Sequence, residues 1–184
     1  MRCLECSHGY LHPLPSEEEL APLYSDLGED DFLGNGMAYK IADYFDAHPR
    51  ALQGFHKRAI NFVNSKTSSN DAEIFDFGCA MGTALRALDL AGYSNSKVFD
   101  IQAELVSAGR KRWGLNLLSG DDKEFFGAHR SSFDCIISSN ILEHLADPAA
   151  TIKELRTLLK PDGWLMISLP NYLYKLRLAG KSHQ

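Results

Sequence analysis

Short apolar segments alternate with segments of helical periodicity from Ala72 onward, and this alternation constrains the fold more than any other feature of the sequence. Apolar runs bounded by turn residues predict strands, whereas apolar positions three or four residues apart predict helices. The strands are expected at Glu73–Phe77, Lys97–Asp100, Leu115–Leu118, Phe133–Ser138 and Trp164–Leu169. The helices between them are expected at Gly82–Ala91, Ala103–Trp113 and Pro148–Lys160. Such alternation favours right-handed crossovers, so we expect an α/β fold with helices on both faces of a doubly wound parallel sheet.

The last predicted helix has the clearest boundary signals. Asp147 is expected to be its N-cap and Pro148 its first residue, while Lys160 faces the negative end of the helix dipole. The run Pro161-Asp162-Gly163 then predicts a turn into the fifth strand.

A helical lead precedes this alternating region. Ser16 and Glu19 have the spacing of a capping box, and amphipathic periodicity runs from Met37 to Asn64 with a break at Pro49. A Ser/Asn-rich loop at residues 65–70 ends the lead. We therefore divide the chain into a Cys-containing segment with a helical cap (1–70), an α/β domain (71–171) and a short tail (172–184).

Composition excludes several classes of protein. A chain of 184 residues suits one ordinary domain. No apolar run reaches the length of a membrane span, and no basic-then-apolar leader stands at the N-terminus, so a cytoplasmic protein is expected. The net charge of -5 disfavours binding to nucleic acid, which needs a basic surface.

The first predicted strand runs into a glycine-containing turn at residues 78–82. Such a turn lets the backbone approach a ligand, although many strand–helix turns need glycine for steric reasons alone. Asp100 ends the next strand, where a carboxylate can accept both hydroxyls of a ribose. The spacing from Gly78 to Gly82 departs from the dinucleotide fingerprint, and no phosphate-binding Lys-Ser/Thr follows it. A ligand with a ribose but without phosphates fits this pattern best.

Four segments together resemble class I S-adenosylmethionine-dependent methyltransferases, which have a Rossmann-like fold. They are Asp76-Phe-Gly-Cys-Ala-Met-Gly82, Phe99-Asp100-Ile101, the run from Phe133 through Asn140 and Glu143-His144 to Pro148, and Leu159-Lys160-Pro161-Asp162-Gly163-Trp164 followed by Leu169-Pro170-Asn171. The resemblance covers about residues 72–171.

The resemblance implies a role for each matching position. Asp76 and the backbone of Gly78, Cys79, Ala80 and Gly82 would face the amino and carboxylate groups of the methionine moiety. Asp100 would hold the ribose, Ile101 would pack on the adenine and Asp121 would meet the adenine amino group, unless Asp121 is simply a solvated loop residue. Ser139 and Asn140 would line the side from which the methyl group is transferred.

Methyl transfer needs alignment above all, and a base where the acceptor is a hydroxyl or an acidic carbon. His144 is the candidate base because imidazole titrates near neutral pH, and the alternative is a histidine that only bonds to backbone. Asn140 is the second candidate for the catalytic side. Some relatives hold a divalent ion with an acid at this position, and Asn140 weakens that option here.

The cysteines suggest two different roles. Cys3 and Cys6 have ligand spacing and resemble half of a zinc ribbon, but structural zinc takes four ligands. His8 and His12 are the alternative further ligands, and a half-site left by truncation is the favoured interpretation. Cys79 and Cys135 fall in or beside buried strands, so packing is expected of them.

The family's last two strands form a hairpin for which the 13 residues after Asn171 are too few. The fold expected is therefore a sheet of about five strands that lacks the final hairpin. Its bare fifth strand would pair with a partner or a second copy, or the chain is a fragment. The leading function is methyl transfer to a small-molecule acceptor. The alternatives are a catalytically incomplete cofactor-binding module and a nicotinamide-dependent oxidoreductase.

Overall fold

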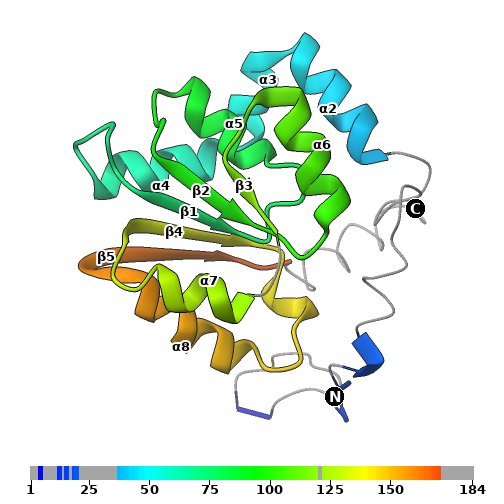
Figure 1. Ribbon diagram of the computed structural model, residues 1–184, viewed down its shortest axis with the longest axis vertical. Helices are drawn as coiled ribbons and strands as arrows, with labels where there is room; N and C mark the ends of the chain where they lie inside the picture. Colours follow the sequence, from blue (N-terminus) through cyan, green and yellow to red (C-terminus); the bar gives the residue numbers. More distant parts are fainter. Residues whose placement is uncertain are drawn as a thin grey trace.

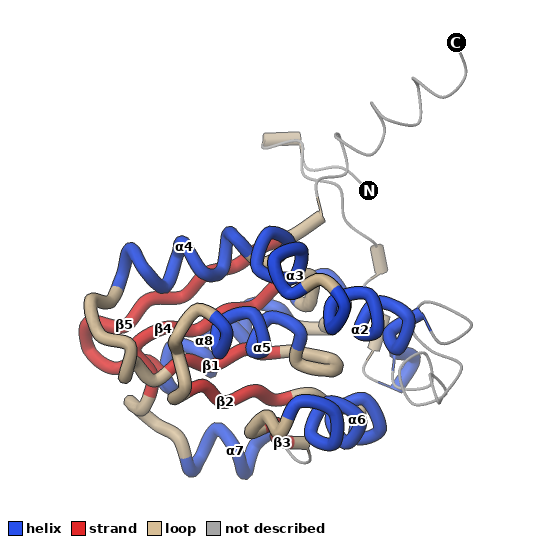
Figure 2. Tube along the Cα trace, turned by 90° about the horizontal axis from the view of Figure 1, so that it is seen from above, coloured by secondary structure: helices blue, strands red, loops and turns tan. Residues whose placement is uncertain are grey.

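Figure 1 shows a computed structural model of the chain, which describes residues 4–5, 12–13, 15–16, 18–20, 37–119 and 122–170. These residues form a five-stranded sheet in the order β3-β2-β1-β4-β5, and every adjacent pair is parallel. Figure 2 shows the strands side by side in this order. Their bounds are β1 Ile74–Phe77, β2 Ser96–Phe99, β3 Leu117–Leu118, β4 Phe133–Ser139 and β5 Leu159–Ser168. The predicted Rossmann-like α/β fold is confirmed.

Helices cover both faces of the sheet (Figure 1). On one face, α4 (Lys57–Lys66), α5 (Thr83–Leu90) and α6 (Ala103–Trp113) bury Val63, Leu88 and Val106 against the strands. On the other face, α7 (Asp122–Ala128) and α8 (Pro148–Leu158) pack against an aromatic cluster that includes Phe75 and Phe133. Because β1 and β4 are fully or almost fully buried, their sequences are continuous apolar runs rather than alternating patterns.

The helical cap comprises α2 (Met37–Ala47), α3 (Pro49–Phe55) and α4. Pro49 occupies the first turn of α3, where its missing N–H is not needed, so the expected break falls at His48. Arg112 of α6 fastens α2 by donating to Asp43 and Asp46, each at 2.6 Å. The predicted capping box is also present, because Ser16 N–H donates to Glu19 and Glu19 N–H donates back to the Ser16 hydroxyl.

The largest correction concerns the junction of α8 and β5. Helix α8 has the predicted N-cap, with Asp147 accepting from Ala150 N–H at 2.9 Å, but it ends at Leu158. Lys160 does not cap the helix dipole; its Nζ instead lies 2.8 Å from Asp134 Oδ2. The predicted turn Pro161-Asp162-Gly163 lies within β5 as an irregularity, because Phe133 pairs with Leu159 whereas Cys135 pairs with Trp164.

Sequence periodicity missed α7 entirely, and it extended β3 by two residues beyond the observed Leu117–Leu118. Phe125 and Phe126 of α7 are buried in the aromatic cluster, and this tertiary packing stabilises a helix too short to be marked by periodicity. Within the described part of the chain, no helix has the length and apolar character needed to cross a bilayer.

Candidate functional site

The strand order has its switch point between β1 and β4, because β2 and β3 follow on one side of β1 whereas β4 and β5 lie on the other. Open α/β sheets bind ligands at such a switch. The site is expected at the carboxyl ends of β1 and β4. After β1, the chain turns through residues 78–82 into α5. Gly78 has φ +80°, and a Cβ added to it would lie 2.2 Å from Ile141 Cδ1. Only glycine fits there, because the segment after β4 presses against the turn.

Asp100 holds the glycine turn against the end of β2. Its Oδ2 accepts from Ala80 N–H at 2.7 Å, and its Oδ1 accepts from Gln102 N–H at 2.9 Å. Gly78 N–H also donates to the carbonyl oxygen of Phe99 at 2.9 Å. The expected neighbourhood of Asp100 and the turn is therefore present. Ala80 has φ +49°, a strained value for a residue with a Cβ, and its bond to Asp100 stabilises it.

Asp76 lies inside β1, two residues before the turn, and only 4% of its surface is exposed. Its carboxylate has no hydrogen-bond partner among residues 37–119 and 122–170. Burial, with a smaller contribution from the charge of Asp100, raises the pKa of Asp76 to about 7. Burial also raises the pKa of Asp100, although the amides of Gln102 and Ala80 oppose this. Two neighbouring buried carboxylates would be stabilised by a cationic or hydrogen-bond-donating group.

Cys79 and Cys135 are buried, as the sequence predicts. They lie in separate hydrophobic clusters. Burial and the two aspartates raise the pKa of Cys79 well above its ordinary value, so its thiol is neutral. Cys79 also shapes the turn, because its carbonyl oxygen accepts from Gly82 N–H at 2.8 Å.

Ser139 and Asn140 follow the buried part of β4. Asn140 has φ +57° and is exposed, and its N–H donates to Ser168 O at 2.8 Å. His144 ends the short 3-10 helix η1 (Leu142–His144) and is partly buried, with Nε2 3.8 Å from Glu143 Oε1. Both candidate catalytic residues thus lie in the segment that contacts Gly78 through Ile141.

Ile101 follows Asp100 and is 65% exposed, which leaves an apolar surface next to the carboxylate. Asp121, Cys3 and Cys6 lie outside the described residues, so their predicted roles remain predictions. Among the residues that the structure does describe, no group of three or more His, Cys, Asp and Glu side chains could hold a metal ion.

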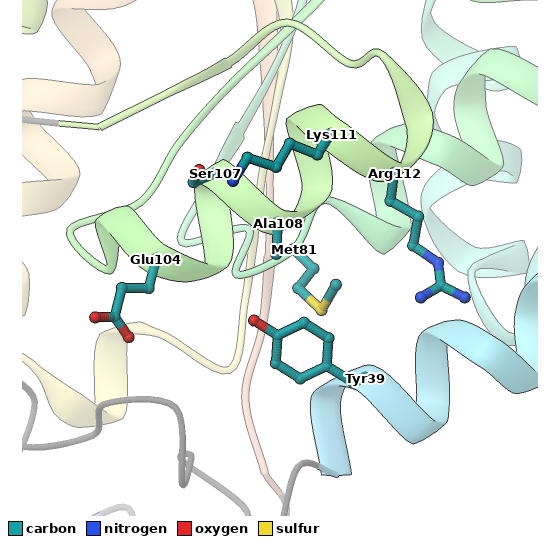
Figure 3. A pocket seen from close by; sticks show the side chains of 7 residues that line it. All are labelled: Tyr39, Met81, Glu104, Ser107, Ala108, Lys111 and Arg112. Carbon is teal, nitrogen blue, oxygen red and sulfur yellow. The ribbon is translucent and has the colours of Figure 1, made fainter.

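Sequence reasoning missed Ile141, whose side chain closes the turn from the β4 side. The only local signal was an apolar residue directly after the exposed Asn140. A cavity of about 480 Å³ between α6 and the start of α2 was not predicted either (Figure 3). None of the predicted cofactor-binding residues lines it, and Met81 alone connects it to the glycine turn; its lining is Tyr39, Met81, Glu104, Ser107, Ala108, Lys111 and Arg112.

Solved structures share this fold. An S-adenosylmethionine-dependent methyltransferase from Archaeoglobus fulgidus is 19% identical with a TM-score of 0.57, and the match covers 84% of this chain and 62% of that one. Another from Mesorhizobium loti is 22% identical with a TM-score of 0.50, covering 62% and 53%. At these identities the likeness concerns the fold alone.

Curated relatives match a smaller share of the chain than the Archaeoglobus fulgidus structure does, but at higher sequence identity. The ubiquinone biosynthesis O-methyltransferase of Hydrogenovibrio crunogenus is 27% identical over 132 residues, which is 68% of this chain and 54% of the relative. The enzyme of the same name from Actinobacillus pleuropneumoniae is 31% identical over 112 residues, covering 56% and 47%. The chain thus spans about half the length of the curated relatives it matches.

A family model described as "Methyltransferase domain" matches residues 45–183, from the helical cap through the sheet. This match includes β1, the glycine turn, Asp100 and the segment after β4, and it extends over well more than half of the chain. The chain belongs to the methyltransferase domain family.

Proposed function

We propose that this chain binds S-adenosylmethionine at the carboxyl ends of β1 and β2 and supplies its methyl group to a small-molecule acceptor. One observation carries the proposal: the Asp100 carboxylate accepts from the amide of Ala80 in the glycine turn, close to Asp76, whose carboxylate has no hydrogen-bond partner among the described residues. A sugar diol and an ammonium group are the complements of these two acids.

The residues present fit the parts of the cofactor. Asp76 would pair with the methionine ammonium, which offsets the cost of burying an unpaired carboxylate. Each Asp100 oxygen accepts one backbone N–H and keeps further acceptor capacity for the ribose hydroxyls. The exposed Ile101 would cover one face of the adenine.

When bound, the cofactor would supply a methyl group attached to its sulfonium sulfur; as the acceptor's lone pair bonds to the methyl carbon, the carbon–sulfur bond breaks and the sulfur leaves as a neutral thioether. The residues of the chain then align the acceptor and accept its proton. His144 would accept the proton at an imidazole nitrogen, and Ser139 and Asn140 would orient the acceptor.

A hydroxyl is the acceptor class to test first. The curated relatives are named O-methyltransferases, and an oxygen acceptor requires the loss of a proton that a nearby imidazole can take. Phenols provide a suitable panel because their proton is acidic enough for histidine to act as the base.

Calorimetric titration with S-adenosylhomocysteine tests the proposal directly. We expect wild-type protein to bind it and Asp100→Asn to bind about 10- to 100-fold more weakly, since charge-assisted hydrogen bonds are lost. Asp134→Asn is the matched control, because Asp134 also accepts a backbone N–H next to β1 but lies at the amino ends of β1 and β4, away from the carboxyl ends that form the proposed site.

The control variant should lose stability and keep its affinity. Titration with NAD under the same conditions distinguishes the oxidoreductase alternative. Preference for NAD, or an Asp100→Asn protein that binds S-adenosylhomocysteine as tightly as wild type, would overturn the assignment.

A further inference from the structure

His56 lies where the helical cap meets α5, and its ring contacts the first residue of that helix. His56 Nε2 is 3.0 Å from Thr83 Oγ1, although the two residues are 27 positions apart in sequence. Thr83 directly follows Gly82, the last residue of the glycine turn. This contact therefore joins the cap to the turn that carries the proposed cofactor site.

The backbone of His56 is held from two directions. Its N–H donates to Leu52 O at 3.0 Å, and its carbonyl oxygen accepts from Ile60 N–H at 3.1 Å. It is thus the C-cap of α3 and the N-cap of α4 at once. Leu52 is 2% exposed and packs with Phe45 and with Ala87 of α5. Because both flanking helices are anchored, the ring of His56 has a fixed place from which to hold Thr83.

The ring is neutral under ordinary conditions. Burial lowers the pKa of His56 to about 4. A neutral imidazole has one donor and one acceptor nitrogen, so Nε2 can pair with the Thr83 hydroxyl in either tautomer. The contact therefore persists at neutral pH without a counter-charge.

The start of α5 has little other support from side chains. Gly82 is its N-cap, with φ +82°, and it offers no side chain to bond the first amides. Asp100 restrains the turn on its other side through Ala80. The hydrogen bond between His56 and Thr83 restrains the other end of the glycine turn, where it enters α5, three residues after Ala80.

We propose that His56 is a positioning residue that sets the glycine turn for cofactor binding through the Thr83 hydroxyl. The proposal rests on the proposed function, since it concerns the geometry of the same turn. It makes the helical cap part of the cofactor site without requiring that any cap side chain touch the cofactor.

The test is a double-mutant cycle with two readouts, the free energy of unfolding in urea and the dissociation constant for S-adenosylhomocysteine. His56→Phe keeps a ring without hydrogen-bonding nitrogens, and Thr83→Val removes only the hydroxyl. We expect each to weaken binding about fivefold, as the loss of one neutral hydrogen bond predicts, and the double variant to bind no more weakly than either single variant. His56→Gln and Thr83→Ser retain a bonding group and should restore most of the affinity.

Tyr93→Phe is the matched control. Tyr93 donates to Asn64 of α4, so this variant also removes one hydrogen bond between the cap and the α/β domain, but away from the turn. It should lower the stability while leaving the affinity unchanged. If His56→Phe and Thr83→Val behave like Tyr93→Phe, the contact is merely structural and the inference is wrong. Failure of wild-type protein to bind S-adenosylhomocysteine would instead overturn the proposed function, and this inference with it.

Discussion

Asp76 illustrates how one side chain can combine a cost in stability with a proposed role in binding. It lies in the strand where an apolar residue would pack best, yet it is a carboxylate without a partner among the described residues. Burial raises its pKa to about 7 from 3.8, so the folded protein binds this proton more tightly than the unfolded chain does. Its contribution to stability is therefore most favourable below about pH 4 and is lost as the pH rises through about 7.

Asp76→Asn removes this titration. We expect the ligand-free variant to be more stable than wild type at about pH 8, by about 1 to 4 kcal/mol, and to differ little near pH 4. Urea unfolding across this pH range measures the difference. The same variant should bind S-adenosylhomocysteine more weakly, because an amide cannot neutralise the ligand's ammonium. A stability difference that stays constant with pH would contradict the assignment.

At position 78 the choice of residue is restricted by steric overlap rather than by charge. Gly78→Ala combines a left-handed backbone with a Cβ that overlaps Ile141, so we expect a loss of about 2 kcal/mol or more in unfolding free energy. Gly114→Ala is the control, since Gly114 has φ +66° but nothing lies within 4 Å of its added Cβ. That variant should lose only about 1 kcal/mol. Equal losses would show that the contact with Ile141 has no energetic weight.

Among the helices, α2 depends on contacts made far along the chain. Arg112 of α6 bonds both Asp43 and Asp46, and Trp113 Nε1 also donates to Asp46 at 2.6 Å. These hydrogen bonds lower the pKa of Asp46 against the opposing effect of burial. Helix α2 therefore holds its place through α6 as well as through its apolar face against α3 and α5.

Arg112→Met should loosen α2 selectively. We expect faster amide hydrogen exchange in α2 with little change in β1, and a loss of at most about 1 kcal/mol in global stability because the ion pairs are partly exposed. Lys97→Met removes the Lys97–Glu73 pair, which involves no residue of α2, and should leave exchange in α2 unchanged. Uniform acceleration of exchange in the Arg112→Met protein would argue against a local role.

At the scale of the whole protein, the β5 edge of the sheet is the feature to consider. Strand β5 pairs with β4 alone among the described residues, and Trp164, Ile167 and Leu169 beside this edge are 49%, 39% and 48% exposed. Lys66 covers one face of Trp164, with its ammonium 3.6 Å from the ring centre. An apolar strand edge of this kind pairs readily with another strand.

We accordingly expect the chain to associate with itself as its concentration rises. Ile167→Lys should shift the equilibrium towards monomer in sedimentation experiments, since a charged edge opposes pairing. Leu90→Lys alters an apolar residue of similar exposure at the end of α5 and serves as the control. A wild-type protein that stays monomeric at high concentration would refute this expectation.

Periodicity and turn chemistry were sufficient for most of the elements. The predicted ends of the strands at Phe77 and Ser138, the N-cap Asp147 and the predicted helix end at Trp113 rest on local signals, and each lies within one residue of a boundary in the structure. The parallel sheet with helices on both faces follows from the alternation of strands and helices and the handedness of their connections. These features depend on neighbours in sequence, which is why they could be predicted.

Tertiary structure decided what depends on distant neighbours. The end of α8 at Leu158 follows from the pairing of Leu159 with Phe133, and α7 forms where Phe125 enters an aromatic cluster. At the site, sequence motifs suggested Asp76, Gly78 and Asp100, but they said nothing of Ile141 against the turn or of His56 on Thr83. Backbone signals are local, whereas packing and burial are properties of groups that only the folded chain brings together.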